Sequence, residues 1–236
     1  MHFVSVKSVE QQDIQGMHRV RERLVKQRVC LINEIRGLLQ EYGLIIPQGR
    51  SNVSKYLSLF LGEVASGLSE RARVLFSDLS EELNELNKKV EKYDLKLKQV
   101  SRSSELCQRL EKVEGVGPIT STALRCAVSD AKAFKNGRCF SAWLGLVPRQ
   151  HSSGGKSNLG KISKRGNVYL RSLLIHGARS ALIRGRSTEK GRWAKSLLGK
   201  KGNNKTNVAL ANKTARILWA MMARGTEYDP DYRKAA

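Results

Sequence analysis

Apolar residues recur at alternating intervals of three and four between Phe76 and Val100, which places them in one stripe along an α-helix. The stripe consists of Phe76, Leu79, Leu83, Leu86, Val90, Tyr93, Leu97 and Val100. An apolar stripe of this length must be covered. We expect a coiled coil that forms a homo-oligomer through residues 76–100. The alternative is packing within one chain against residues 12–41, which have a matching spacing.

Helical periodicity also marks residues 12–41, about 167–184 and about 207–223, and Asn167 is suited to cap the second of these helices. Neither the alternation of a strand nor an internal repeat of roughly 20 to 50 residues is found. The sequence therefore predicts a mainly α fold, in which a long helix and a coiled coil precede a basic helical domain. The expected boundaries are a helical connector over 1–68, a coiled-coil helix over 69–103 and a basic domain over 104–236.

Positive charge is concentrated in the second half of the chain. The whole chain has 43 Lys and Arg against 21 Asp and Glu, and residues 101–236 hold 27 of the bases and 8 of the acids. Between residues 151 and 205 there are 14 basic side chains and a single acid, Glu189. This imbalance favours nucleic acid as the partner. An anionic membrane surface is a poorer fit, because glycines interrupt the basic stretch.

The sequence has no apolar run near the roughly 18 to 20 residues of a membrane span, and no secretory signal at its start. We therefore expect no membrane partner and a location in the prokaryotic cytosol, associated with the nucleoid. The four cysteines lack the C-x-x-C spacing and the partner histidines of a zinc site. We expect them to be reduced core thiols: Cys30, Cys107, Cys126 and Cys139.

A Gly-Val-Gly-Pro turn at residues 115–118 has the pattern of a helix-hairpin-helix. The glycines permit a tight turn, Pro118 suits the first position of the following helix, and free N–H groups there can bind a phosphate. The pattern predicts nucleic-acid contacts at Gly115, Gly117 and Thr120. A plain turn between two helices, with the glycines needed for geometry alone, is the alternative.

Serines and cations share a glycine-rich segment at residues 149–167, which we expect to be a loop. A serine hydroxyl is a weak nucleophile, but nearby cations can stabilise its alkoxide and the charge that develops on an attacked phosphate. A serine that only donates a hydrogen bond to a phosphate is the simpler interpretation. The predicted nucleic-acid contacts of this segment are Arg149, Lys156, Lys161, Lys164, Arg165 and Arg171.

Several of these motifs, in this order, resemble the DEDD insertion-sequence transposases, a group similar to pilin-gene invertases that includes RNA-bridged recombinases. The resemblance implies a DNA transposase or site-specific recombinase that binds DNA and a structured guide RNA and uses a serine nucleophile. That serine precedes a glycine in the loop after G-L-x-P, which makes it Ser153 here, with Ser152 as the fallback. The matching segments are residues 6–13 through His18, Arg19 and the arginines after them, the coiled coil, and residues 115–118, 145–150, 152–155 and 211–219.

Members of this group carry their metal-binding acids in an amino-terminal RuvC-like domain, and the resemblance places the start of this chain after those acids. We therefore expect Glu10 and Asp13 not to be metal ligands. No metal or other cofactor is expected on this chain alone, and Mg²⁺ is expected only together with the acidic domain. The alternative function is a truncated remnant that holds nucleic acid without cutting it.

Overall fold

The computed structural model describes residues 6–62, 67–151, 153–156, 158–185 and 188–231. The fold is mainly α, as the periodicity predicts. The chain divides into two compact units, which we describe separately. The helical unit is Gly16–Lys96, and the basic unit is Met1–Gln15 together with Leu97–Ala236.

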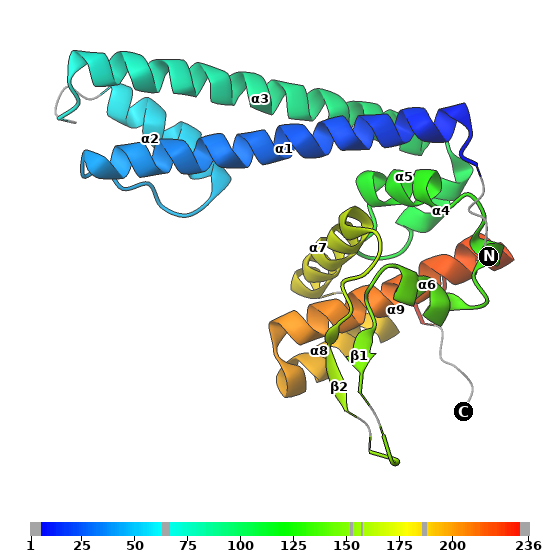
Figure 1. Ribbon diagram of the computed structural model, residues 1–236. Coiled ribbons are helices and arrows are strands. Elements are labelled where there is room, and N and C mark those ends of the chain that lie inside the picture. Colours follow the sequence, from blue (N-terminus) through cyan, green and yellow to red (C-terminus); the bar gives the residue numbers. More distant parts are fainter. Residues whose placement is uncertain (1–5, 63–66, 152, 157, 186–187, 232–236) are drawn as a thin grey trace. The chain divides into compact units, whose positions relative to one another are not determined.

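Three helices contribute to the helical unit: α1 (Val9–Glu41), α2 (Arg50–Gly62) and α3 (Glu70–Arg102) (Figure 1). The predicted apolar stripe lies on α3, and its members Phe76, Leu83 and Val90 are at most 2 % exposed. They share one core with side chains of α1 and α2, including Leu24, Leu31, Ile35, Leu39, Val53 and Leu57. Within the helical unit, helices of the same chain therefore cover the stripe, which is the alternative that the sequence left open. Self-association through residues 76–100 stays a prediction.

Polar contacts also link α1 to α3 inside the helical unit. Arg21 is ion-paired with Asp94, and Arg28 Nη1 donates a hydrogen bond to Asn87 Oδ1 over 3.3 Å. His18 on α1 is only 3 % exposed. Burial, reinforced by the charge of Arg21, lowers the pKa of His18 to about 4. The imidazole is therefore neutral at pH 7.

The core of the basic unit forms around its last helix. Its elements are α4 (Glu105–Glu111), α5 (Pro118–Ala127), the short helix η2 (Ala131–Ala133), α6 (Gly137–Trp143), α7 (Val168–Arg184), α8 (Glu189–Lys201) and α9 (Asn203–Arg224). Helix α9 contacts α4, α6, α7 and α8. Its Ala211, Ala215 and Leu218 are fully buried, so α9 organises this unit.

Side-chain caps fix where several helices of the basic unit begin. Asn167 accepts a hydrogen bond from the N–H of Leu170 over 3.0 Å, which confirms the predicted cap of α7. Pro118 is the first residue of α5, as predicted. Ser104, Asn136 and Thr188 cap α4, α6 and α8 in the same way.

Apolar side chains between residues 134 and 146 are part of the core of the basic unit. Phe140, Leu144 and Leu146 are at most 1 % exposed, and Phe134 and Trp143 pack against them. The cysteine prediction is only half right. All four are free thiols, but only Cys107 and Cys126 are buried, while Cys30 and Cys139 are exposed.

The prediction that residues 149–167 form a loop is wrong in part, because parts of this segment belong to two strands. Strands β1 (Pro148–Gln150) and β2 (Leu159–Ile162) pair antiparallel into a hairpin, the one sheet that the described residues form. The hairpin extends away from the helices of the basic unit (Figure 1). A hairpin holds its tip in a defined conformation that a loop does not, which matters for the serine it carries.

Candidate nucleic-acid interface

Ser153 lies at the tip of the hairpin, beside a turn of two glycines. The Lys156 N–H donates to the Ser153 carbonyl over 3.0 Å, and these two residues form a β-bridge. Gly154 and Gly155, between them, have φ angles of 55° and 76°. Positive φ at both central residues is the requirement of a type I′ turn, whose twist matches that of the strands. The glycines therefore fix the hairpin, and Ser153 and Lys156 face each other across it.

Close backbone contacts hold the base of the hairpin. A Cβ added to Gly145 would lie 2.1 Å from the Arg165 carbonyl oxygen, and one added to Gly166 would lie 1.8 Å from that of Trp143. Both glycines have positive φ angles, of 72° and 88°. The two chain segments can cross here only because neither glycine has a side chain. This crossing sets the direction in which the hairpin leaves the helices.

Arg171 links the two crossing segments by hydrogen bonds. It is 7 % exposed, and its Nη1 donates to the carbonyl oxygens of Leu144 and Arg165 over 3.0 and 3.2 Å. Asn212 on α9 adds a bond from Nδ2 to the Leu146 carbonyl over 3.1 Å. Arg171 was predicted to bind nucleic acid, and the structure gives its guanidinium internal partners. The sequence did not predict that Arg171 would bind these backbone carbonyl groups, because no local pattern indicates it.

The other predicted cations of this segment are exposed. They lie on the hairpin, at Arg149, Lys156 and Lys161, and at its base, at Lys164 and Arg165. All of residues 148–162 that carry charge are basic, so the hairpin presents a single sign of charge to solvent. Ser152, the fallback nucleophile, lies outside the described residues. The structure thus brings Ser153 and five exposed cations together on one hairpin and its base.

The predicted turn at residues 115–118 lies between α4 and α5. Gly115 has a φ of +86°, and a Cβ there would meet the Gly177 carbonyl oxygen of α7 at 2.4 Å. Gly117 precedes α5, and its carbonyl accepts the N–H of Thr120, whose side chain is 6 % exposed. Close packing against α7 therefore explains why a glycine is needed at position 115, which is the alternative that the sequence left open. Phosphate binding by Gly115, Gly117 and Thr120 stays a prediction.

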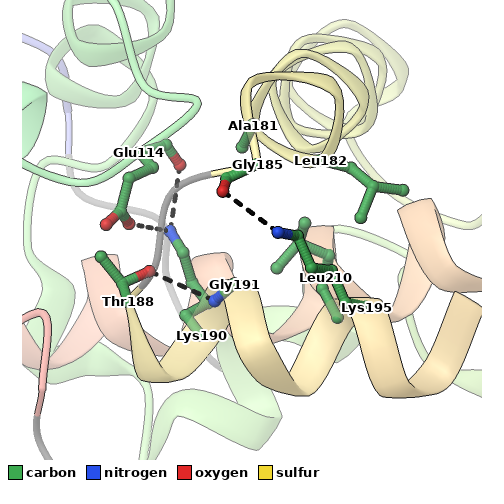
Figure 2. A pocket seen from close by; sticks show the side chains of 10 residues that line it. Glu114, Ala181, Leu182, Gly185, Thr188, Lys190, Gly191, Lys195 and Leu210 are labelled. Atoms are coloured by element: carbon green, nitrogen blue, oxygen red, sulfur yellow. Dashed lines mark hydrogen bonds and ion pairs between the residues drawn. The ribbon is translucent and has the colours of Figure 1, made fainter.

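A buried ion pair that the sequence did not reveal joins this turn to α8 (Figure 2). Lys190 Nζ lies 2.8 Å from Glu114 Oε2 and donates to the Glu114 carbonyl over 3.0 Å. Tyr228 donates its hydroxyl to the same carboxylate over 2.5 Å. Both charged side chains are at most 8 % exposed. The cavity that both residues line measures about 10 Å³, and a second one of about 100 Å³ is lined by Glu114 and the turn but not by Lys190. Because each charge is buried against its partner, the pair joins the turn to α8 as part of the fold.

The environment changes the proton affinities within this cluster. Burial lowers the pKa of Lys190, although its pairing with Glu114 acts in the opposite direction. Burial by itself would raise the pKa of Glu114, but the hydrogen bonds from Lys190 and Tyr228 outweigh it and lower the pKa. Burial and the neighbouring Glu114 carboxylate raise the pKa of Tyr228 far above its ordinary value. Glu114 therefore stays ionised in the folded protein at neutral pH.

Acidic residues after α9 neutralise cations near the same turn. Glu227 lies 3.0 Å from Arg109 Nε and 2.8 Å from Lys112 Nζ. Asp231 lies 3.5 Å from Arg192 on α8. Residues 226–231 thus engage bases of α4 and α8. These ion pairs include none of the cations of the hairpin, whose strands and tip carry no acid.

A metal site finds no support in the described part of the chain. No group of three or more His, Cys, Asp or Glu side chains comes together there. Glu10, which we expected not to be a ligand, forms an ion pair with Arg125 over 2.8 Å. We therefore derive no chemical step through a metal. Among the described helices, none combines the length and the hydrophobicity needed to cross a membrane.

Comparisons with known proteins confirm the resemblance to insertion-sequence transposases. Residues 107–194 match the model of the transposase IS116/IS110/IS902 family, and this segment contains the hairpin and the turn. A transposase for insertion sequence element IS1111A of Coxiella burnetii is 46 % identical over 230 residues. A probable family 20 transposase of Pseudomonas aeruginosa is 46 % identical over 234 residues, and a transposase for insertion sequence element IS1328 of Yersinia enterocolitica is 35 % identical over 233.

These alignments cover nearly all of the chain but not all of its relatives. The matched part is 97 % of the chain for the Coxiella protein, 98 % for the Pseudomonas protein and 97 % for the Yersinia protein. It is only 63 %, 69 % and 68 % of the length of these three relatives, in the same order. Identity at this level over such a length implies a shared fold and origin. The chain belongs to the IS116/IS110/IS902 family of insertion-sequence transposases.

Proposed function

We propose that the chain acts in DNA transposition of an insertion sequence, with the hairpin as the part that engages the DNA strand and Ser153 as the nucleophile. The observation that carries this proposal is the place of Ser153 at the exposed tip of a hairpin fixed by a type I′ turn. A nucleophile needs a defined position as well as access to its target. The hairpin supplies both.

The charge around Ser153 supports the same proposal. Lys156 faces it across the turn, and Arg149 and Lys161 lie further along the two strands. An attacked phosphodiester gains negative charge in the transition state, and fixed cations stabilise that charge. The same cations attract the DNA backbone before any reaction takes place. DNA, and a structured RNA in the manner of the resembling group, are the proposed partners.

A binding-only role is the second candidate, and the lack of a metal-ligand cluster among the described residues favours it. Cations neutralise phosphate but do not hold the metal ions that assist many phosphodiester reactions. We therefore propose that the chain alone binds, and that cutting requires acids supplied in addition. The relatives are longer than the match, and the part outside it is the natural source of those acids.

The test is a covalent adduct between protein and DNA. The 236-residue chain is mixed with the part of the Pseudomonas relative that the alignment leaves out, Mg²⁺, and a duplex spanning the chain's own coding region and flanks. We expect an adduct whose DNA-linked peptide contains Ser153, formed only in the complete mixture. Ser153→Ala should reduce it by at least about 100-fold, as removal of a covalent nucleophile does.

The control is Ser172→Ala, which removes an exposed hydroxyl on α7 of the same unit and should leave the adduct unchanged. An adduct that survives Ser153→Ala would move the role to Ser152 or another residue. Strand cutting by the chain without the added part would contradict the proposed dependence. Tight binding without any adduct in the complete mixture would favour the binding-only role.

A further inference from the structure

We infer that His151 accepts the proton of Ser153 and that Lys156 stabilises the oxyanion this creates, an assignment that rests on Ser153 being the nucleophile. Neither the family match nor the relatives' descriptions assign His151 a role. The inference comes from the register of the hairpin. That register places an imidazole, a hydroxyl and an ammonium on one face of its tip.

The pairing near the tip is regular. Ser153 is paired with Lys156, the N–H of His151 donates to the Asn158 carbonyl over 2.9 Å, and Gln150 is paired with Leu159. Partners across an antiparallel pair share a face, and residues two apart along a strand share it too. His151, Ser153 and Lys156 therefore lie on the same face, together with Asn158. Gln150 and Leu159 lie on the other.

The distances implied by this arrangement suit a proton transfer. Side chains directly opposite each other have Cβ atoms about 4.5 to 5.5 Å apart, so Lys156 reaches the Ser153 hydroxyl. His151 is two residues, or roughly 6.6 Å of strand, from Ser153, within the reach of an imidazole. The two-glycine turn fixes this register. The irregularity between Pro148 and Gln150 lies at the far end of the hairpin and leaves the tip regular.

The electrostatic surroundings of His151 are simple. Lys156 shares its face, and so does Arg149, two residues earlier along the same strand. Lys161 lies further along the opposite strand. Residues 148–162 contain no Asp or Glu, and every described residue from 148 to 161 is exposed, so no helix packs on this face. A ring nitrogen of the His151 imidazole can accept the proton of a neighbouring hydroxyl.

The chemical step balances without a further reagent. The Ser153 Oγ forms a bond to phosphorus while its proton passes to an imidazole nitrogen of His151. The bond from phosphorus to the departing sugar oxygen breaks, and that oxygen takes the proton from the imidazolium. The products are a phosphoserine diester and a free hydroxyl. Lys156 stabilises the negative charge on Oγ before attack and on the phosphoryl oxygens during it.

The first experiment uses Ser153→Cys in the full chain, because a thiol at this position reports its own ionisation. Iodoacetamide modification is followed by peptide mass spectrometry between pH 5 and 9, with the exposed Cys30 and Cys139 as references in the same molecule. A thiolate beside an imidazole and an ammonium ionises at lower pH. We expect the thiol at position 153 to react about tenfold faster than Cys139 at pH 7, a shift of about one pKa unit.

Matched substitutions in that background identify the groups responsible. His151→Gln and Lys156→Gln should each slow the reaction at least about threefold, because the first removes the group that takes the thiol proton and the second removes the ammonium that stabilises the thiolate. His176→Gln and Lys135→Gln remove the same kinds of side chain from exposed positions elsewhere in the unit and should leave the rate unchanged. Equal effects of His151→Gln and His176→Gln, or a thiol no faster than Cys139, would overturn the inference.

The second measurement separates this inference from the proposed function. In the DNA adduct assay, His151→Gln should lower the rate at pH 7 and flatten its dependence on pH, because a general base acts only in its unprotonated form. An unchanged pH profile with a normal Ser153 adduct would refute His151 as the acceptor and leave the proposed function intact. A fast thiol with no adduct in any mixture would support the arrangement and count against Ser153 as the nucleophile.

Discussion

The helical unit and the basic unit differ most in what they leave exposed. Residues 16–96 hold 14 bases and 11 acids, whereas the remaining residues hold 29 and 10. The helical unit uses its opposite charges internally, as in the contact of Arg21 with Asp94 between α1 and α3. The basic unit has too few acids to neutralise its own bases, and the hairpin carries bases without any acid. The two units therefore differ in net charge, and the basic unit is the one in which we propose a polyanion site.

The two units also differ in how closely backbone segments approach each other within each unit. Gly115, Gly145, Gly166 and Gly177, where an added Cβ would lie within 3.0 Å of backbone atoms, all belong to the basic unit. Gly16 and Gly37 on α1 have no atom within 4 Å of such a Cβ. Side chains hold the helices of the first unit apart, while glycines let the segments of the second cross. The crossing at Gly145 and Gly166 lies at the base of the hairpin and fixes its position on the unit.

The largest effect on stability is expected from breaking the buried pair of the basic unit. Lys190→Met leaves the Glu114 carboxylate buried with only Tyr228 as a partner, and should cost about 3 to 5 kcal/mol. Lys26→Met in the helical unit breaks an exposed pair with Glu22 and should cost below about 0.5 kcal/mol. Urea unfolding checks both. Equal costs would remove the distinction between the two units.

A smaller contrast is expected between two glycines. Gly166→Ala combines a positive φ with a clash against the Trp143 carbonyl, and should cost about 2 to 4 kcal/mol. Gly37→Ala, in the middle of α1 with open space around it, should stabilise by about 0.5 to 1 kcal/mol. Thermal unfolding measures both changes. A tolerated alanine at position 166 would show that the crossing can open.

Acid should weaken the helical unit first. Because the pKa of His18 falls from 6.5 to about 4 on folding, the unfolded chain binds an extra proton between these values. Stability is full above about pH 6.5 and falls by at most roughly 3 kcal/mol as the pH drops toward 4. Glu114 has a lowered pKa, so its contribution is lost only as the pH falls through that lower value.

Tryptophan emission and hydrogen exchange distinguish the loss of stability in the helical unit from that in the basic unit. Trp143, Trp193 and Trp219 all lie in the basic unit, so tryptophan emission reports on that unit, and hydrogen exchange reports on both. His18→Gln should flatten the pH dependence of the helical unit between pH 6.5 and 4. If exchange in α1 and α3 stays constant over this range in the unaltered chain, His18 is not the group responsible.

Much of the fold could be predicted because its signals are local. The helix over 12–41 is observed as Val9–Glu41, and the expected last helix over 207–223 as Asn203–Arg224. What covers the apolar stripe of α3 could not be predicted, since one spacing suits a second chain and a neighbouring helix equally. Helix α8 was missed because its apolar positions are few between lysines and arginines.

The candidate site could be predicted in residue type but not in conformation. The Gly-Gly pair after Ser153 is a known signal for a hairpin, but the flanking residues lack apolar alternation, since the hairpin is exposed on both faces. The roles of Arg171 and Lys190 depend on carbonyl groups and a carboxylate distant in sequence. No local pattern distinguishes such buried cations from those on the surface.

The central claim is that the polyanion site lies on the hairpin, and charge-matched variants test it most directly. One variant replaces Arg149, Lys156, Lys161 and Lys164 by Gln, and the other replaces four exposed lysines of the helical unit, Lys26, Lys55, Lys88 and Lys92. Duplex DNA affinity is measured against salt concentration. The hairpin variant should lose about 3 to 4 from the slope of log affinity on log salt, at about 0.9 per phosphate contact, while the helical variant keeps it. Equal losses in both variants, or a full slope without the hairpin cations, would contradict the claim.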